Sequence, residues 1–136
     1  MMGKYRYMVN AKLAPVLTIT LLTLSACAKP IDEQEALEAI SCLEFLGHAQ
    51  GAAYRHEIRY SQKFLLEQMG KIASYLPKLD TEVETWEQAR IDQFLQRIDQ
   101  AKLRGKEMAG EAMAHNWSRR LDLDRIRSCN KVMDGL

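Results

Sequence analysis

The sequence predicts an all-α protein, a four- to five-helix antiparallel bundle that follows a cleaved N-terminal signal. Beyond residue 32, apolar side chains recur every three or four residues, which is the period of an amphipathic helix. No stretch alternates apolar and polar residues as a half-buried strand would. A chain of 136 residues has the length of one domain.

The first 28 residues differ in composition from the rest. Three charges precede Lys29, all of them basic: Lys4, Arg6 and Lys12. Residues 13–26 carry no charge and end in small side chains, the pattern of a secretory signal. An uncleaved membrane anchor is the alternative, although a span needs about 20 apolar residues and Lys12 limits this run. Met8 offers a second possible start, because the segment after it keeps the whole pattern.

A first helix is predicted from Glu33 into the fifties. Asp32 and Glu35 have the spacing of a capping box, in which two side chains bond the free amides of a helix start. The predicted apolar face is Ala39, Leu43, Leu46, Ala49 and Ala53. Gly47 and Gly51, four residues apart, predict the close approach of a neighbouring helix.

A second apolar stripe follows, either as a separate helix or as an extension of the first that bends near residues 59–61. Its members are Tyr60, Phe64, Leu65, Met69, Ile72 and Leu76. Pro77 is predicted to end this helix, because proline has no amide hydrogen to continue the ladder.

The remainder predicts two or three further helical segments. Thr81 and Glu84 form a second capping box, which opens a helix with the stripe Val83, Trp86, Ile91, Phe94, Leu95 and Ile98. Gly105 predicts a stop or bend, followed by a helix with Met108, Ala109, Ala112, Met113 and Trp117. Asp122 then caps a last segment that carries Leu123, Ile126, Cys129 and Met133.

Charge limits the kinds of partner. All 18 acidic residues but only 16 of the 19 Lys and Arg follow Ala28, so the net charge of that part is −2. A nucleic-acid-binding protein would carry a clear basic excess. Residues 32–57 hold six acids against one arginine, whereas residues 119–131 hold five bases against two acids. These opposite signs predict that the first and last segments lie side by side. A solvated lattice of salt bridges explains the charge pattern as well as a partner site does, and is the preferred interpretation.

The three cysteines are Cys27, Cys42 and Cys129. In an exported protein Cys42 and Cys129 are a natural disulfide pair, because both fall inside the predicted bundle. Two buried free thiols are the alternative. The odd count leaves Cys27 unexplained.

Leu24-Ser25-Ala26-Cys27 resembles the lipobox of bacterial lipoproteins: an aliphatic residue, two small residues and an obligatory cysteine. The resemblance covers the first 27 residues. It implies a diacylglyceryl group on the Cys27 sulfur, cleavage before Cys27 and acylation (palmitate, for example) of the new amine. Two or three acyl chains anchor a protein stably where one is marginal.

The resemblance also implies a location in the cell envelope. Ala28 follows the cysteine in place of the Asp that tends to retain such lipoproteins in the inner membrane, so the expected site is the outer membrane, facing the periplasm. The expected parts are a signal peptide (1–26), a lipidated tether (27–31) and a periplasmic helical domain (32–136). Ordinary cleavage before Lys29 is the alternative, because Ala26-Cys27-Ala28 also has a small-x-small form; the product would be soluble in the periplasm.

The sequence offers no catalytic constellation, so the protein is expected not to be an enzyme and to need no cofactor. No G-x-S-x-G, HExxH, CxxC or CxxCH pattern occurs. His48 and His56, with neighbouring acids and His115, are weak candidates for a metal site. Isolated surface histidines explain the pattern equally well.

A weaker resemblance involves Cys42, Phe45 and Gly47. These residues are similar to a helix of the type VI secretion amidase immunity (Tai) family, small periplasmic proteins stapled by a disulfide, although the spacing departs from the family's form. The leading hypothesis is a lipid-anchored, non-enzymatic protein that binds an envelope protein or supports an envelope assembly. A small-ligand or metal carrier and an immunity-like protein are the alternatives.

Overall fold

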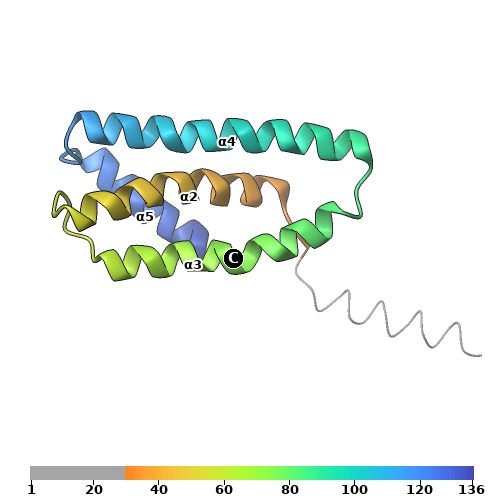
Figure 1. Ribbon diagram of the computed structural model, residues 1–136, viewed down its shortest axis with the longest axis horizontal. Helices are drawn as coiled ribbons and strands as arrows, with labels where there is room; N and C mark the ends of the chain where they lie inside the picture. Colours follow the sequence, from red (N-terminus) through yellow and green to blue (C-terminus); the bar gives the residue numbers. More distant parts are fainter. Residues whose placement is uncertain (1–29) are drawn as a thin grey trace, which may run out of the picture. The chain divides into compact units, whose positions relative to one another are not determined.

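The computed structural model describes residues 30–136, and this part of the chain contains four helices and no strand. In chain order they are α2 (Glu33–Tyr54), α3 (Gln62–Val83), α4 (Gln88–Ala114) and α5 (Arg120–Asp134). Successive helices run in opposite directions, which confirms an all-α antiparallel bundle (Figure 1). The expected signal and Cys27 lie outside the described residues.

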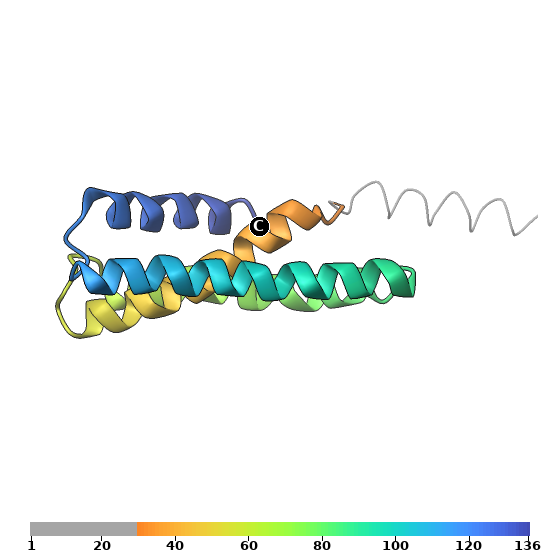
Figure 2. The same ribbon diagram turned by 90° about the horizontal axis from the view of Figure 1, so that it is seen from above.

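Helix α2 is the centre of the bundle and packs against each of the other three helices. Half of its 22 residues are buried, including neighbours that face different directions, such as Ala36, Leu37, Ala39 and Ile40. A helix that is apolar on every side belongs in a buried position. In Figure 2, α2 crosses obliquely from the side of α5, where it begins, to the side of α3 and α4, where it ends.

The start of α2 agrees with the prediction, and α3 is a separate helix. The Asp32 carboxylate accepts a hydrogen bond from the Gln34 amide at 2.8 Å, so it caps α2. The Ser61 hydroxyl accepts one from the Phe64 amide at 3.4 Å and caps α3. Each cap satisfies an amide that has no partner within its helix.

Two predicted boundaries in α3 are wrong. Pro77 lies inside the helix, which continues to Val83. Both Pro77 and Ala73, whose carbonyl would have accepted the missing hydrogen bond, are exposed, so water can satisfy that carbonyl. Thr81 opens no helix; its hydroxyl donates to the Pro77 carbonyl at 2.9 Å within the last turns of α3.

The predicted interruption at Gly105 is also wrong, because α4 runs without a break from Gln88 to Ala114. Gly105 is buried where α4 meets α2. A Cβ atom there would lie 2.4 Å from the Ser41 carbonyl oxygen and 2.7 Å from Glu44 Cβ. Glycine costs a helix about 1 kcal/mol relative to alanine, and close packing of the two backbones offsets that cost.

Gly47 and Gly51 have no such role, which contradicts their predicted use. A Cβ at Gly47 would meet only the end of the Met69 side chain, at 3.8 Å. At Gly51 it would approach the Arg55 guanidinium at 3.4 Å. Neither glycine faces the backbone of another helix, so the close helix contact of this fold belongs to Gly105.

Helix α5 begins at Arg120, and Arg119 rather than Asp122 occupies the capping position. Asp122 is fully buried inside the first turn and accepts two hydrogen bonds from the Arg119 guanidinium, at 2.8 and 3.2 Å. The predicted cap is therefore wrong, because this carboxylate binds a guanidinium and not the amides of the helix start. These bonds raise the pKa of Arg119.

The turn between α4 and α5 places Trp117 in the core. Asn116 and Trp117 have φ angles of 53° and 55°, a region that bulky residues rarely occupy. The Trp117 amide donates to the Ala112 carbonyl at 2.7 Å, and its ring lies 5.6 Å from that of Phe45. Trp117 is 3% exposed, so burial of its indole offsets the backbone strain and directs α5 back along α2.

Candidate functional site

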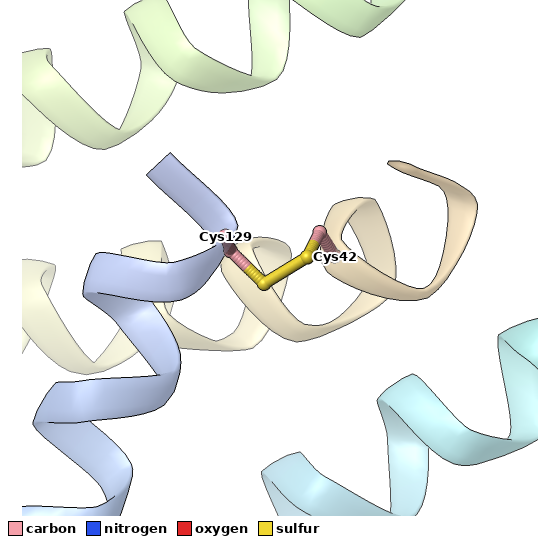
Figure 3. The surroundings of a disulfide bond; sticks show 2 residues. All are labelled: Cys42 and Cys129. Carbon is pink, nitrogen blue, oxygen red and sulfur yellow. A yellow bond between two sulfur atoms is a disulfide. The ribbon is translucent and has the colours of Figure 1, made fainter. Parts of the chain in front are cut away.

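The structure brings the predicted disulfide pair together. Cys42 on α2 and Cys129 on α5 are joined by an S–S bond of 2.12 Å, with their Cα atoms 5.3 Å apart (Figure 3). Both residues are buried. The bond links residues 87 apart in the sequence and attaches the last helix to the first, which also confirms that these two segments lie side by side.

The histidines named as weak metal candidates lie in different settings. His48 is exposed on α2 and lines a hollow of about 260 Å³ together with Glu44 and Met69. His56 follows α2 in the connection to α3, with a φ of 59°. Within residues 30–136, no three His, Cys, Asp or Glu side chains are grouped so that they could hold a metal ion.

A larger groove, of about 620 Å³, lies between α2, α4 and α5 beside the disulfide. Because α2 packs against both α4 and α5, it forms the floor of this groove and the other two helices form its walls. Leu37, Met108 and Val132 supply apolar surface, one from each helix. Cys42 and Cys129 also line it, so the disulfide holds one wall to the floor.

The charged side chains of the groove are mainly basic. Arg97 and Arg104 on α4 and Arg125 on α5 face a single acid, Glu38 on α2. This is a local excess of positive charge in a region whose net charge is −2. Positive charge that lines a partly enclosed surface attracts anionic groups more strongly than the same charge spread over an open face.

Two of these arginines already have carboxylate partners. Arg97 lies 3.5 Å from Glu33, and Arg125 lies 2.9 Å from Glu111. Glu111 also lies 3.8 Å from Arg119, so it connects α4 to both the start and the middle of α5. The salt-bridge lattice predicted from the charge pattern therefore runs largely through α4.

Arg104 differs from its neighbours. It belongs to a row on α4 with a spacing of seven residues, or about two helical turns: Arg90, Arg97, Arg104 and Glu111. Arg90 pairs with Glu33 at 3.1 Å and stacks 3.6 Å over the Trp86 ring. Within the described part of the chain, Arg104 alone in this row has no ion-pair partner.

The sequence analysis missed this groove because it assigned no role to Arg97 or Arg104 and counted Arg125 only among the bases of the last segment. The seven-residue repeat of arginine on α4 was a visible signal. That repeat does not show which arginine lacks a partner, since this depends on acids contributed by α2 and on the position of α5.

Comparisons of the chain with protein families, with curated proteins and with solved structures give no match. None of the four described helices combines the length and the hydropathy that a bilayer crossing requires.

Proposed function

We propose that this protein is a lipid-anchored, non-enzymatic protein of the bacterial outer membrane, and that its helical domain binds another envelope protein through the groove between α2, α4 and α5. The observation that carries the binding role is Arg104, whose exposed side chain lines the groove and has no ion-pair partner among the described residues. The lipobox-like residues 24–27 support the anchoring. The Tai-like immunity role stays a prediction from Cys42, Phe45 and Gly47 alone.

A lipid on Cys27 would keep the groove near the membrane. Six residues lead from Cys27 to Glu33, the first residue of α2. Even fully extended, they span only about 20 Å. Leu37 and Glu38 lie in the next turns of α2 and line the groove. A partner that is itself attached to the membrane would therefore reach the groove more readily than a freely diffusing one.

The anchoring is tested on the protein expressed with its own signal in a Gram-negative host. Intact mass should show acyl additions on Cys27 as the first residue. A Cys27→Ala variant should leave the membrane fraction or stay unprocessed, whereas Ala28→Asp should move the lipidated protein to the inner membrane. A wild-type protein that begins at Lys29 and is released with the periplasmic contents would contradict the proposal.

The binding role is tested by chemical cross-linking in intact envelopes, followed by purification of the protein. We expect one envelope protein to be cross-linked reproducibly to the wild type. The matched variants are Arg104→Glu, which reverses a charge in the groove, and Lys102→Glu, which makes the same change on α4 at an exposed residue outside the groove lining. Absence of any specific cross-linked protein, or equal loss with both variants, would contradict the assignment of the groove.

A small-ligand carrier is the second candidate, because a groove of about 620 Å³ falls within the usual size range of ligand sites, about 300–1,000 Å³. Native mass spectrometry of the protein purified from envelopes separates the two functions. A small molecule that co-purifies with the wild type and is lost from Arg104→Glu would favour the carrier.

A further inference from the structure

We propose that the groove recognises an acidic, amphipathic segment of its partner, with a carboxylate of that segment bound by Arg104. This inference rests on the proposed protein-binding function and specifies the chemistry of the partner. It follows from the charge of the groove, from the spacing of its arginines and from the apolar surface between them.

The arginines of the row on α4 differ in their ion-pair partners. Glu33 serves both Arg90 and Arg97, and Glu111 serves both Arg119 and Arg125. Each end of the row therefore already has an ion-pair partner within the described chain. Arg104, in the middle, keeps all its guanidinium donors available for a ligand.

Glu38 is the acid within the groove that could compete for Arg104. Its carboxylate accepts a hydrogen bond of 3.4 Å from the Gln34 amide group, one turn earlier on α2. Glu38 forms no ion pair with Arg104, and Arg97 and Arg125 already have Glu33 and Glu111 as partners, so Arg104 is the guanidinium of the groove that an incoming acid can neutralise.

The spacing favours a chain segment over a single small anion. Arg97 and Arg104 are seven residues apart on α4, which is about 10 Å along the helix axis. Arg125 stands on the opposite wall, on α5. A peptide with acids about two helical turns apart can place one carboxylate at Arg104 and another beside Arg97, which it would share with Glu33, whereas one small anion would meet both arginines only if their side chains converged on it.

The apolar residues specify the rest of the ligand. Leu37, Met108 and Val132 line the same groove as the arginines, so an acidic segment that also carries apolar side chains would bury them there. An amphipathic helix bound in a groove between helices can supply both the carboxylates and the apolar side chains. A uniformly acidic, fully hydrated chain would leave this apolar surface uncovered.

The test uses the full processed protein in non-ionic detergent and a fluorescent amphipathic peptide of about four helical turns with glutamate at every seventh residue. Fluorescence anisotropy gives its affinity, with protein-free detergent as the blank. We expect the glutamate peptide to bind and its glutamine counterpart to bind at least about tenfold more weakly, because charge-assisted hydrogen bonds are lost.

The matched variants locate the binding. Arg104→Glu should weaken the glutamate peptide at least about tenfold, whereas Lys102→Glu should change its affinity less than about threefold. A lysine version of the peptide should bind Arg104→Glu better than it binds the wild type, which shows that the variant is folded and that charge decides the preference. Equal weakening by both variants, or equal binding of glutamate and glutamine peptides, would overturn the inference.

Competition identifies other anions. Pyrophosphate and mixed micelles of the detergent with phosphatidylglycerol should not displace the glutamate peptide from the protein; displacement by either would overturn the choice of a protein segment. The outcome is separable from the proposed function. A cross-linked envelope partner that Arg104→Glu still retains would leave the binding of an envelope protein standing, and would refute both this inference and the assignment of that binding to the groove. Specific binding of the glutamate peptide without any cross-linked envelope protein would support this inference and contradict the proposed function.

Discussion

Helix α2 meets α4 and α5 by two different means, and the difference explains where the groove lies. Along α4 the contact is made by small side chains, and at Gly105 no Cβ atom fits against Ser41. Against α5 the contact is tied by the Cys42–Cys129 bond. The close backbone contact between α2 and α4 leaves no space for a groove at that point. The disulfide holds α2 and α5 together and still permits a groove beside the bond.

The two contacts also differ in what they require of the sequence. The α2–α4 contact needs small residues at four positions on α4: Ala101, Gly105, Ala109 and Ala112. Helix α5 has 15 residues and buries only Asp122, Ile126, Cys129 and Met133. With so small an apolar face, its position depends strongly on the disulfide and on the Arg119–Asp122 pair. Three variants can test this comparison.

The largest effect is expected from removing the disulfide, in a variant that carries both Cys42→Ala and Cys129→Ala. In the chain-entropy model, a closed loop of this length contributes about 4–5 kcal/mol to the free energy of unfolding, a large part of the total stability of a small domain. Urea unfolding followed by circular dichroism measures the change, with Ser128→Ala as the control.

Amide hydrogen exchange shows where the structure opens in that variant. Protection should fall first in α5, because α2 and α4 keep their own contact. A uniform loss of protection in all four helices, or a stability within about 1 kcal/mol of the wild type, would mean that packing alone positions α5.

The next effect is expected from Gly105→Ala. Its added methyl group would overlap the Ser41 carbonyl, so α2 and α4 must separate, and overpacking of this kind costs about 2–3 kcal/mol. Gly110→Ala is the matched control on the same helix, because its Cβ would meet nothing within 4 Å. The control should be neutral or more stable by up to about 1 kcal/mol. Thermal unfolding curves that coincide for the two variants would contradict the close contact.

The smallest effect is expected from Asp122→Asn. Asparagine keeps the shape but removes the charge that pairs with Arg119, at a cost of about 1–2 kcal/mol. Asp124→Asn is the control, since its side chain is 48% exposed and pairs at the surface with Arg120 and Arg127, where such pairs contribute about 0–1 kcal/mol. If the two variants unfold at the same urea concentration, Asp122 does not help to position α5.

The local signals in the sequence had unequal value. Helical spacing of apolar residues correctly indicated an all-α fold. The predicted cap at Asp32 agrees with the observed start of α2, and the break considered near residues 59–61 lies where α3 begins. Pro77, Gly105 and Asp122 were misleading for one common reason. Each carries a local preference worth about 1–3 kcal/mol that its surroundings in the fold offset: close packing at Gly105, the ion pair at Asp122, and at Pro77 the exposure of the freed carbonyl to water.

The sequence by itself determined the helical class, because apolar periodicity is a property of the chain alone. It favoured the pairing of Cys42 with Cys129 only for an exported protein, and the tertiary structure brings the two together. Only the tertiary structure decided that α4 packs backbone to backbone on α2 and that Arg104 remains unpaired in the described region beside the disulfide. The physical reason is that a groove and its free charge depend on distances between side chains from three helices. No local pattern in one helix encodes those distances.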